Sequence, residues 1–350
     1  MLKILVISKM KRFLLLSAFH GLCVTCSYPQ WEHGVSGFFA GKIGGTFVLA
    51  GGCNFPDVPA ADKGKKVFYQ DIFTLNGRRL GTLPEPVAYG VAVTYDRRLL
   101  CAGGSNENGS LNSVYGLKLT KAHPEITPMA SLPVTMDNMS GAVCQNKWYL
   151  VGGNQDGVPS NQVFSLDLDN AQAVWQQEPS YPGPPRLQAV CVAQGGRLFL
   201  IGGFCPKLDS APASVSLDAL CFDPLSGQWT PVAAPVDEMG QPVSVGGGYG
   251  VPIGDSLLVV AGGVHKDIFL NALNGLYGTD YMKQSPEWYQ LNPRLLQYDI
   301  TRNQWTVLGS NKAWARAGAI LVKKSERRLY WIHGELKPGI RTPDIQKIKI

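Results

Sequence analysis

The sequence predicts an all-β fold made of repeated small sheets, and the main observation is a strand ending that recurs along the chain. An apolar run closing on Gly-Gly occurs five times, and a sixth, altered copy reads Tyr-Trp-Ile-His-Gly. The six endings are Gly51-Gly52, Gly103-Gly104, Gly152-Gly153, Gly202-Gly203, Gly262-Gly263 and His333-Gly334. Their spacing is near the roughly 50-residue period of propeller blades, and two longer intervals indicate insertions. The 40 glycines, 24 prolines and 17% charged residues are typical of short strands joined by tight turns. We therefore expect a six-bladed β-propeller.

Each repeat continues beyond this ending with a second recurring pattern. A strand ending in an aromatic residue and Asp precedes a strand that carries Trp, as in Phe222-Asp223 before Trp229 and Tyr298-Asp299 before Trp305. This pattern resembles the kelch repeat, and the resemblance covers nearly all of residues 28–350. It implies blades of four antiparallel strands within one domain over residues 27–350.

The two ends of the chain predict how the ring of blades closes. The last repeat has one further strand, over residues 344–350, and no Trp strand after it. The segment Tyr28 to Trp31 ends in Gln-Trp, like the strands that end at Trp229 and Trp305. Because closure removes free sheet edges, we expect this N-terminal segment to supply the outer strand of the sixth blade.

The first 26 residues have the order of a secretory signal peptide. Cations at Lys9 to Arg12 precede the apolar run 13–19, and small or polar residues follow. We therefore expect export, to the periplasm, of the domain over residues 27–350, with lipid modification of Cys26 as an open alternative. No later segment is apolar for about 18 residues, so no membrane span is expected.

Charge and cysteine usage exclude several classes of function. The formal charge is +6, but four of the cations lie in the first 26 residues, which contain no acid. The remaining domain therefore lacks the basic surface typical of a nucleic-acid-binding protein. The cysteines after residue 26 show no Cys-x-x-Cys pair and no His at metal spacing, which predicts no metal site. Cys205 and Cys221 are the one disulfide pairing we consider. The sequence does not indicate an oligomeric state.

A polar site is expected at one face of the ring. In a four-stranded blade, the loop after the second strand and the loop leading into the first strand emerge on the same face, where functional loops are commonly placed. The residues that this arrangement selects as ligand-binding candidates are Asn54, Asn138, Asn154, Arg186 and His265. Arg186 fits either of two roles, a fork onto a ligand carboxylate or a structural contact within the repeat.

The long insertion over residues 265–293 is rich in aromatic and amide side chains. Such residues, Asn271 among them, suit stacking on and hydrogen bonding to a sugar. The alternative, which we favour for most of the aromatic residues, is that they pack the insertion onto its blade.

Glu335 directly follows the altered sixth ending and is the candidate proton acceptor. A carboxylate at the mouth of the channel suits acid and base chemistry. The alternative is a structural ion pair with Arg341 or Lys337 that holds the loop in place.

The segment Glu335 to Thr342 reads ELKPGIRT, and here the chain resembles the bacterial N-acetylneuraminate (sialic acid) mutarotases, which are kelch propellers. Further likeness lies in the segments 292–299, 88–91 and 183–186. The Trp strand and Gly-Gly that follow the motif in that family occur here at the N-terminus, so the chain resembles a cyclically permuted form. Val87 stands where the family can show Arg.

The resemblance implies an isomerase (epimerase) that interconverts the α and β anomers of N-acetylneuraminate or a related sugar acid. Opening a hemiketal ring needs acid and base groups and no cofactor. By the motif, Glu335 takes the role of proton acceptor, and Arg341 orients it or binds the substrate carboxylate. Arg186 and Lys337 are further candidates for substrate binding.

Two other functions compete with this interpretation. One is a non-enzymatic kelch module that binds carbohydrate or protein, because fold does not determine function. The other is a copper radical oxidase of the kelch type, which the five histidines of the chain hardly support.

Overall fold

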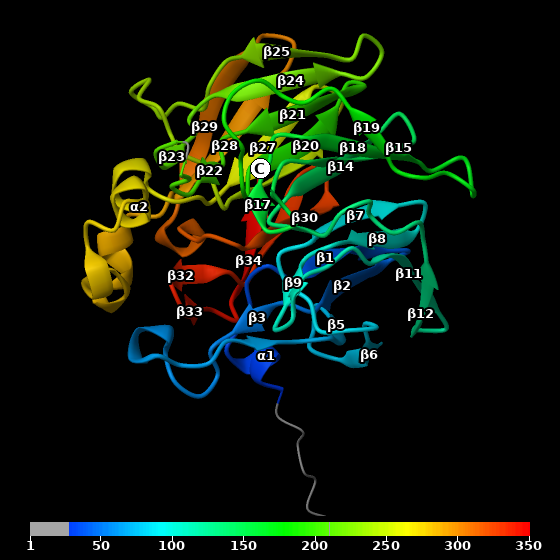
Figure 1. Ribbon diagram of the computed structural model, residues 1–350, viewed down its shortest axis with the longest axis horizontal. Coiled ribbons are helices and arrows are strands. Elements are labelled where there is room, and N and C mark those ends of the chain that lie inside the picture. Colours follow the sequence, from blue (N-terminus) through cyan, green and yellow to red (C-terminus); the bar gives the residue numbers. More distant parts are fainter. Residues whose placement is uncertain (1–27, 210) are drawn as a thin grey trace, which may run out of the picture.

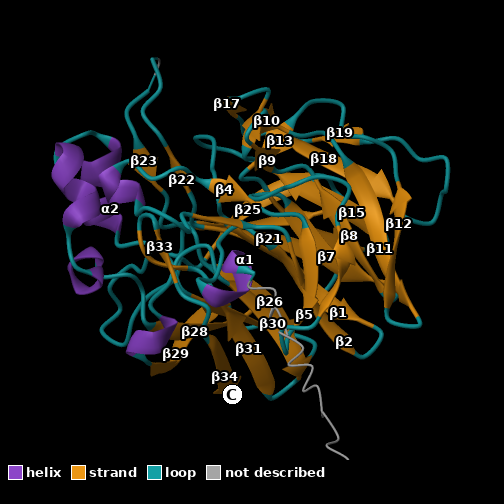
Figure 2. Cartoon of the chain, turned by 90° about the horizontal axis from the view of Figure 1, so that it is seen from below, coloured by secondary structure: helices purple, strands orange, loops and turns teal. Residues whose placement is uncertain are grey.

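The computed structural model describes residues 28–209 and 211–350, and the expected signal peptide lies outside this part of the chain. The regular secondary structure of the described chain is mainly antiparallel sheet (Figures 1 and 2). No helix in the described residues is both long and apolar enough to cross a membrane.

Five antiparallel sheets of four strands follow one another along the described chain. The first contains β1 (Phe39–Ile43), β2 (Thr46–Ala50), β5 (Asp71–Thr74) and β6 (Arg79–Thr82), and the second β7 (Val91–Tyr95), β8 (Arg98–Ala102), β11 (Val114–Thr120) and β12 (His123–Pro128). The third contains β14 (Ser140–Cys144), β15 (Lys147–Val151), β18 (Val163–Asp167) and β19 (Gln176–Glu178), and the fourth β20 (Val190–Gln194), β21 (Arg197–Ile201), β24 (Ala219–Asp223) and β25 (Gln228–Val232). The fifth contains β26 (Tyr249–Ile253), β27 (Leu257–Ala261), β28 (Arg294–Asp299) and β29 (Gln304–Ser310). A sixth sheet has three described strands, β30 (Ile320–Ser325), β31 (Arg328–Ile332) and β34 (Ile345–Lys349).

Short pairings follow the Gly-Gly endings on one face. They are β3 (Cys53–Asn54) with β4 (Val67–Phe68), β9 (Ser105–Asn106) with β10 (Gly109–Ser110), β16 (Asn154–Gln155) with β13 (Met136–Asp137) and β17 (Val158–Pro159), β22 (Phe204–Cys205) with β23 (Ser214–Val215), and β32 (Glu335–Lys337) with β33 (Ile340–Arg341). Both glycines of each ending have positive φ, for example 68° at Gly51 and 91° at Gly52. Glycine adopts this backbone at no steric cost, which explains the recurring pair. In the sixth copy His333 adopts φ 51° instead.

Helical segments are few and gather mainly in the long insertion between β27 and β28. There α2 (Lys266–Leu273), η2 (Gly278–Lys283) and η3 (Pro286–Tyr289) lie at one side of the molecule (Figure 1). The other helical segments are α1 (Pro29–Glu32), η1 (Ala60–Asp62) and η4 (Lys312–Trp314).

The N-terminal segment does not form the expected outer strand. Residues Pro29–Glu32 form the helix α1, with proline in its first turn, where its fixed φ suits a helix and its missing N–H costs nothing. Trp31 packs against Phe73, with ring centroids 5.7 Å apart, and against His333, at 5.8 Å. The prediction of a strand over this segment was wrong, because its aromatic side chains cover a blade interface instead of extending a sheet.

The aromatic and Trp pattern of the repeats pairs neighbouring strands and ties one blade to the next. Phe222 lies opposite Trp229 and Tyr298 opposite Trp305, with centroids 4.9 Å and 5.0 Å apart. The indole N–H of Trp305 donates to the carbonyl of Ala233, 2.7 Å away in the preceding repeat. A buried indole needs such an acceptor, so the pattern stabilises the contact between blades.

Candidate active site

A cycle of backbone hydrogen bonds lies where the chain leads into the inner strands. It runs through Gly37, Tyr89, Asn138, Gln188, Gly247 and Gly318, each with positive φ. The N–H of each residue donates to the carbonyl of the preceding one, with distances of 2.7 Å at Tyr89 and 2.8 Å at Asn138, and Gly37 donates to Gly318 at 3.4 Å. These bonds link residues of successive repeats and return to the first. The inner strands β1 and β30 also contact each other.

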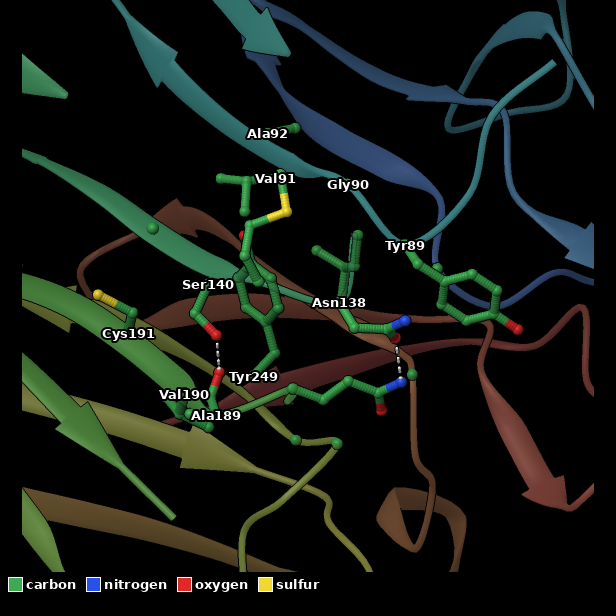
Figure 3. Close-up of a pocket in the computed structure, with 18 of the residues that line it drawn as sticks. Tyr89, Gly90, Val91, Ala92, Asn138, Ser140, Ala189, Val190, Cys191 and Tyr249 are labelled. Atoms are coloured by element: carbon green, nitrogen blue, oxygen red, sulfur yellow. Dashed lines mark hydrogen bonds between the residues drawn. The ribbon is translucent and has the colours of Figure 1, made fainter. Parts of the chain in front are cut away.

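These six residues frame a central cavity of about 130 Å³ (Figure 3). Gln188 donates a hydrogen bond to the side-chain oxygen of Asn138 at 2.7 Å, and the Tyr89 hydroxyl points away from the other labelled side chains. The cavity is smaller than the roughly 300–1,000 Å³ typical of ligand pockets. It adjoins a larger cavity of about 790 Å³ along the inner strands, with which it shares the lining residues Ala92, Cys191 and Tyr249.

Glu335 and Arg341 face each other across the pairing of β32 with β33. Arg341 Nη2 lies 2.5 Å from Glu335 Oε1, and Ser36 Oγ donates to the same oxygen at 3.3 Å. Arg341 Nε donates to Ser36 Oγ at 3.1 Å, which completes a triangle between the first and sixth repeats. The ion pair that the sequence left as an alternative is therefore present. It orients the carboxylate and leaves Oε2 without a hydrogen-bond partner among the described residues.

The guanidinium of Arg341 is buried beside aromatic and polar groups. Its side chain is 2% exposed, and Phe55 lies over it with the ring centroid 5.1 Å away. Burial alone would lower the pKa of Arg341, but Glu335, Tyr89 and Cys53 together raise it above its ordinary value. Arg341 therefore stays charged and holds Glu335 in one orientation.

Tyr89 and Cys53 lie next to Glu335 and Arg341 and belong to the same cluster. Cys53 Sγ donates to the Tyr89 hydroxyl at 3.2 Å. Burial raises the pKa of both groups, so both are neutral at physiological pH. Arg341 and Glu335 both affect the two pKa values, which indicates that all four side chains lie within short electrostatic range.

Lys66 is a second cation at this site. Its ammonium lies 5.3 Å from the ring centroid of Tyr89 and 5.9 Å from those of Phe55 and Phe68. Phe55 thus lies between Lys66 and Arg341. From the sequence, the basic pair Lys65-Lys66 is interpreted as a solvated turn, because its loop leaves the periodic pattern of the repeats.

On its other side, Glu335 lines a small cavity of about 50 Å³ with His265, Tyr281 and Lys337. Lys337 Nζ donates to the carbonyls of Gln284, at 2.7 Å, and Met282, at 3.3 Å. Lys337 therefore ties the long insertion to the β32–β33 pairing, and its ammonium is engaged by protein carbonyls.

Two predicted binding residues belong to this insertion. His265 caps α2, because its Nδ1 accepts a hydrogen bond from the N–H of Ile268 at 3.4 Å. Asn271 donates to the Tyr277 hydroxyl at 3.2 Å. Tyr277, Tyr281 and Trp288 contact one another, as expected if most of these aromatic residues pack the insertion. Only His265 of the two predicted residues shares a cavity with Glu335.

The predicted asparagines are bound within the protein. Asn54 donates to the carbonyl of Gly34 at 2.9 Å and accepts from Tyr69 at 2.7 Å. Asn138 and Asn154 both donate to Asp137 Oδ1, at 2.5 Å and 2.8 Å. Asn138 lines the central cavity, whereas Asn54 lies beside Arg341 in a separate cavity of about 240 Å³.

Arg186 makes the contacts expected of the structural role. Its Nη2 pairs with Asp218 at 2.8 Å, and Nη1 donates to the carbonyl of Gly202 at 3.3 Å. Arg316 makes equivalent contacts with Asp344 and the carbonyl of His333. The repeat of this arrangement in two blades favours a role in tying each Gly-Gly ending to its own sheet, away from Glu335.

The described cysteines, including Cys205 and Cys221, are free thiols. Within the described ranges, no group of three or more His, Cys, Asp or Glu residues is arranged to hold a metal ion.

The fold and this polar cluster define a β-propeller with a carboxylate site, and comparison with known proteins agrees with this class. The solved structure of YjhT superposes with a TM-score of 0.63 at 17% sequence identity, covering 90% of this chain and 95% of that one, which shows a shared fold. The model of the N-acetylneuraminate epimerase family matches residues 129–350, more than half of the chain. The chain therefore belongs to the N-acetylneuraminate epimerase family.

Relatives with this name share part of their length with the chain. The N-acetylneuraminate epimerase of Yersinia pestis (strain Pestoides F) is 34% identical over 225 residues, which is 60% of this chain and 55% of that protein. The N-acetylneuraminate epimerase of Brucella melitensis biotype 1 is 27% identical over 234 residues, 63% of this chain and 58% of that protein. The chain thus spans a little over half the length of the curated relatives it matches.

Proposed function

We propose that this protein is a mutarotase that interconverts the α and β anomers of N-acetylneuraminate, or of a closely related sugar acid. The observation that carries the proposal is the carboxylate of Glu335. One oxygen is held by Arg341 and Ser36, the other has no hydrogen-bond partner among the described residues, and Glu335 lines a cavity. A base held in one orientation with one open oxygen is what proton abstraction from a sugar hydroxyl requires.

The reaction follows from this arrangement. Glu335 Oε2 takes the proton of the anomeric hydroxyl, the bond from the anomeric carbon to the ring oxygen breaks, and a ketone forms. The ring oxygen takes up a proton from water. Rotation about the adjacent carbon–carbon bond presents the other face of the ketone. The ring then closes by the reverse steps, and Glu335 returns its proton to the new anomeric oxygen.

Arg341 acts through Glu335 in this proposal. Two of its three guanidinium nitrogens, Nη2 and Nε, hold the carboxylate directly and through Ser36, so the base does not need to be ordered at the moment of reaction. The ring of Phe55 lies over the buried guanidinium, whereas the side chain of Glu335 is 24% exposed and accessible to a ligand.

Proton NMR of freshly dissolved, anomerically enriched N-acetylneuraminate tests the proposal. We expect the wild type to accelerate equilibration and Glu335→Gln to lose about 10²- to 10⁴-fold of that acceleration. Glu326→Gln, which changes an exposed carboxylate beside Lys323, is the matched control and should keep wild-type activity.

The alternative is a carbohydrate- or protein-binding module without activity. Retention of the acceleration by Glu335→Gln would remove the proposed role of this residue. No acceleration by the wild type, with N-acetylneuraminate binding seen by saturation-transfer NMR, would favour a binding module instead.

We further propose that the sheets form a closed ring of six blades. The cycle of backbone hydrogen bonds through Gly37 and Gly318 supports this arrangement, as does the contact of β1 with β30. Closure places Ser36 of the first blade against Glu335 of the sixth, so the site depends on it.

Export to the periplasm is also part of the proposal and depends on residues 1–26 of the sequence. The mass and N-terminal sequence of the protein recovered from cell fractions test it. A protein that retains residues 1–26 in the cytosolic fraction would contradict it.

A further inference from the structure

Lys66 lies beside the Glu335 site, where no described carboxylate pairs with its charge. Three aromatic rings, Phe55, Phe68 and Tyr89, surround its ammonium within 5.9 Å. A ring face attracts a cation but does not neutralise it or accept its three hydrogen bonds as a carboxylate does. In the described part of the chain, no carboxylate forms an ion pair with Lys66.

The charge balance of the site leaves Lys66 as the available cation. Arg341 is engaged with Glu335 at 2.5 Å, and this pair is neutral as a unit. Lys337 is bound to two backbone carbonyls of the insertion. Arg186, for which the sequence left a carboxylate contact and a structural role open, is paired with Asp218.

Lys66 also lies close to the reacting group. It shares the ring of Phe55 with Arg341, and both cations lower the pKa of the Cys53 thiol against the larger effect of burial. The ring of Tyr89, which Lys66 contacts, lines the central cavity.

The chemistry of a 2-keto sugar acid requires a cation at such a position. Its carboxylate is attached to the anomeric carbon, one bond from the atom whose hydroxyl the base deprotonates. A site that takes this proton therefore has the substrate's negative charge next to the negative charge of Glu335. A nearby cation offsets this repulsion, since the interaction of two like charges at contact distance is unfavourable.

We propose that Lys66 binds the carboxylate of the sugar acid and determines the preference of the site for an acidic over a neutral sugar. This inference rests on the proposed mutarotase function. Lys66 acts on substrate binding, and Glu335 carries the proton transfer.

Anomer exchange measured by NMR over a range of substrate concentrations tests the role of Lys66. The substrates are N-acetylneuraminate and its methyl ester, which keeps the ring but has no charge. We expect Lys66→Met to raise KM for N-acetylneuraminate roughly 10- to 100-fold and to change KM for the ester little. Lys66→Arg should restore much of the loss, because it returns the charge and keeps the contacts with the rings.

Lys65→Met is the matched control. Lys65 is the neighbouring residue, its side chain is 83% exposed, and it pairs with Glu107 at 3.8 Å. We expect this variant to keep wild-type kinetics with both substrates.

The outcomes separate the two proposals. A wild type that does not accelerate anomer exchange overturns the proposed function, and the role of Lys66 with it. If the wild type is active and Lys66→Met has the same KM for N-acetylneuraminate as the wild type, only the role of Lys66 is overturned. An equal rise in KM for the acid and the ester also overturns it, because it shows a packing role without charge recognition.

Discussion

His333 makes the stability of this protein sensitive to acid. It stands where the other repeats have the first glycine of the pair, is 2% exposed, and lies between the rings of Trp31 and Phe38. Neither ring nitrogen has a hydrogen-bond partner among the described residues. Burial, and secondly the charge of Arg316, lower the pKa of His333 from 6.5 to about 4.

The sign and size of the effect follow from this pKa. The unfolded chain takes up a proton near pH 6.5, whereas the folded protein does so only near pH 4, so unfolding binds protons between these values. The stability contributed by neutral His333 is therefore present above pH 6.5 and is lost as the pH falls toward 4. At 1.36 kcal/mol per pH unit, the full loss is about 3 kcal/mol.

Urea unfolding of the wild type and of His333→Asn at several pH values between 7 and 4 measures this effect. Asparagine does not titrate and tolerates positive φ better than most residues, so the variant should fold. We expect the free energy of unfolding of the wild type to fall up to about 1.4 kcal/mol per pH unit more steeply than that of the variant. Equal slopes for the two proteins would refute the reasoning, because carboxylates titrate in both.

Two further predictions concern the glycine endings and the long insertion. Gly262→Ala should destabilise the fold by at least about 1–3 kcal/mol, because φ is 73° and the added Cβ would lie 2.4 Å from the carbonyl oxygen of Arg316. Thermal unfolding measures this loss of stability. The control is Gly240→Ala, because Gly240 also has positive φ but is exposed and has open space around it. Lys337→Met should free the insertion from β32, because the two hydrogen bonds to its carbonyls are lost. The rate of amide hydrogen exchange should then rise in residues 278–289 and remain unchanged in β28. An unchanged exchange rate in residues 278–289 would contradict the role of Lys337.

The repeat pattern of the sequence was sufficient to predict the sheets. Each Gly-Gly ending is followed by a short strand or loop on one face, and Phe222 and Tyr298 lie opposite the Trp residues that follow them. These features are local, since a glycine pair with positive φ and a cross-strand aromatic pair each depend on residues close in sequence. Strand order and the pairing of Glu335 with Arg341 could therefore be predicted.

The N-terminal segment shows where local likeness fails. Its Gln-Trp ending resembled the outer strands, yet Pro29 begins a helix and Trp31 packs on Phe73. A short motif does not report which neighbours its side chains will meet, and here the tertiary contacts overrode the strand preference.

Which of the predicted binding residues are already bound within the protein is decided mainly by the tertiary structure. The sequence placed Arg186 and several asparagines at the mouth, but Arg186 pairs with Asp218, and Asn154 donates to Asp137. The sequence predicts a solvated turn at the basic pair Lys65-Lys66, because nothing around it indicates that three aromatic rings from different segments surround Lys66.

The sequence by itself determined the repeats, their turns and the carboxylate with its neighbouring arginine. Only the tertiary structure decided what surrounds that carboxylate, because Ser36 meets Glu335 and Arg341 across 299 and 305 residues of chain. Contacts of this separation arise when the first and last sheets come together, and no local periodicity encodes them. The charge that remains free at the site, on Lys66, is set by which of these distant partners neutralise the other cations.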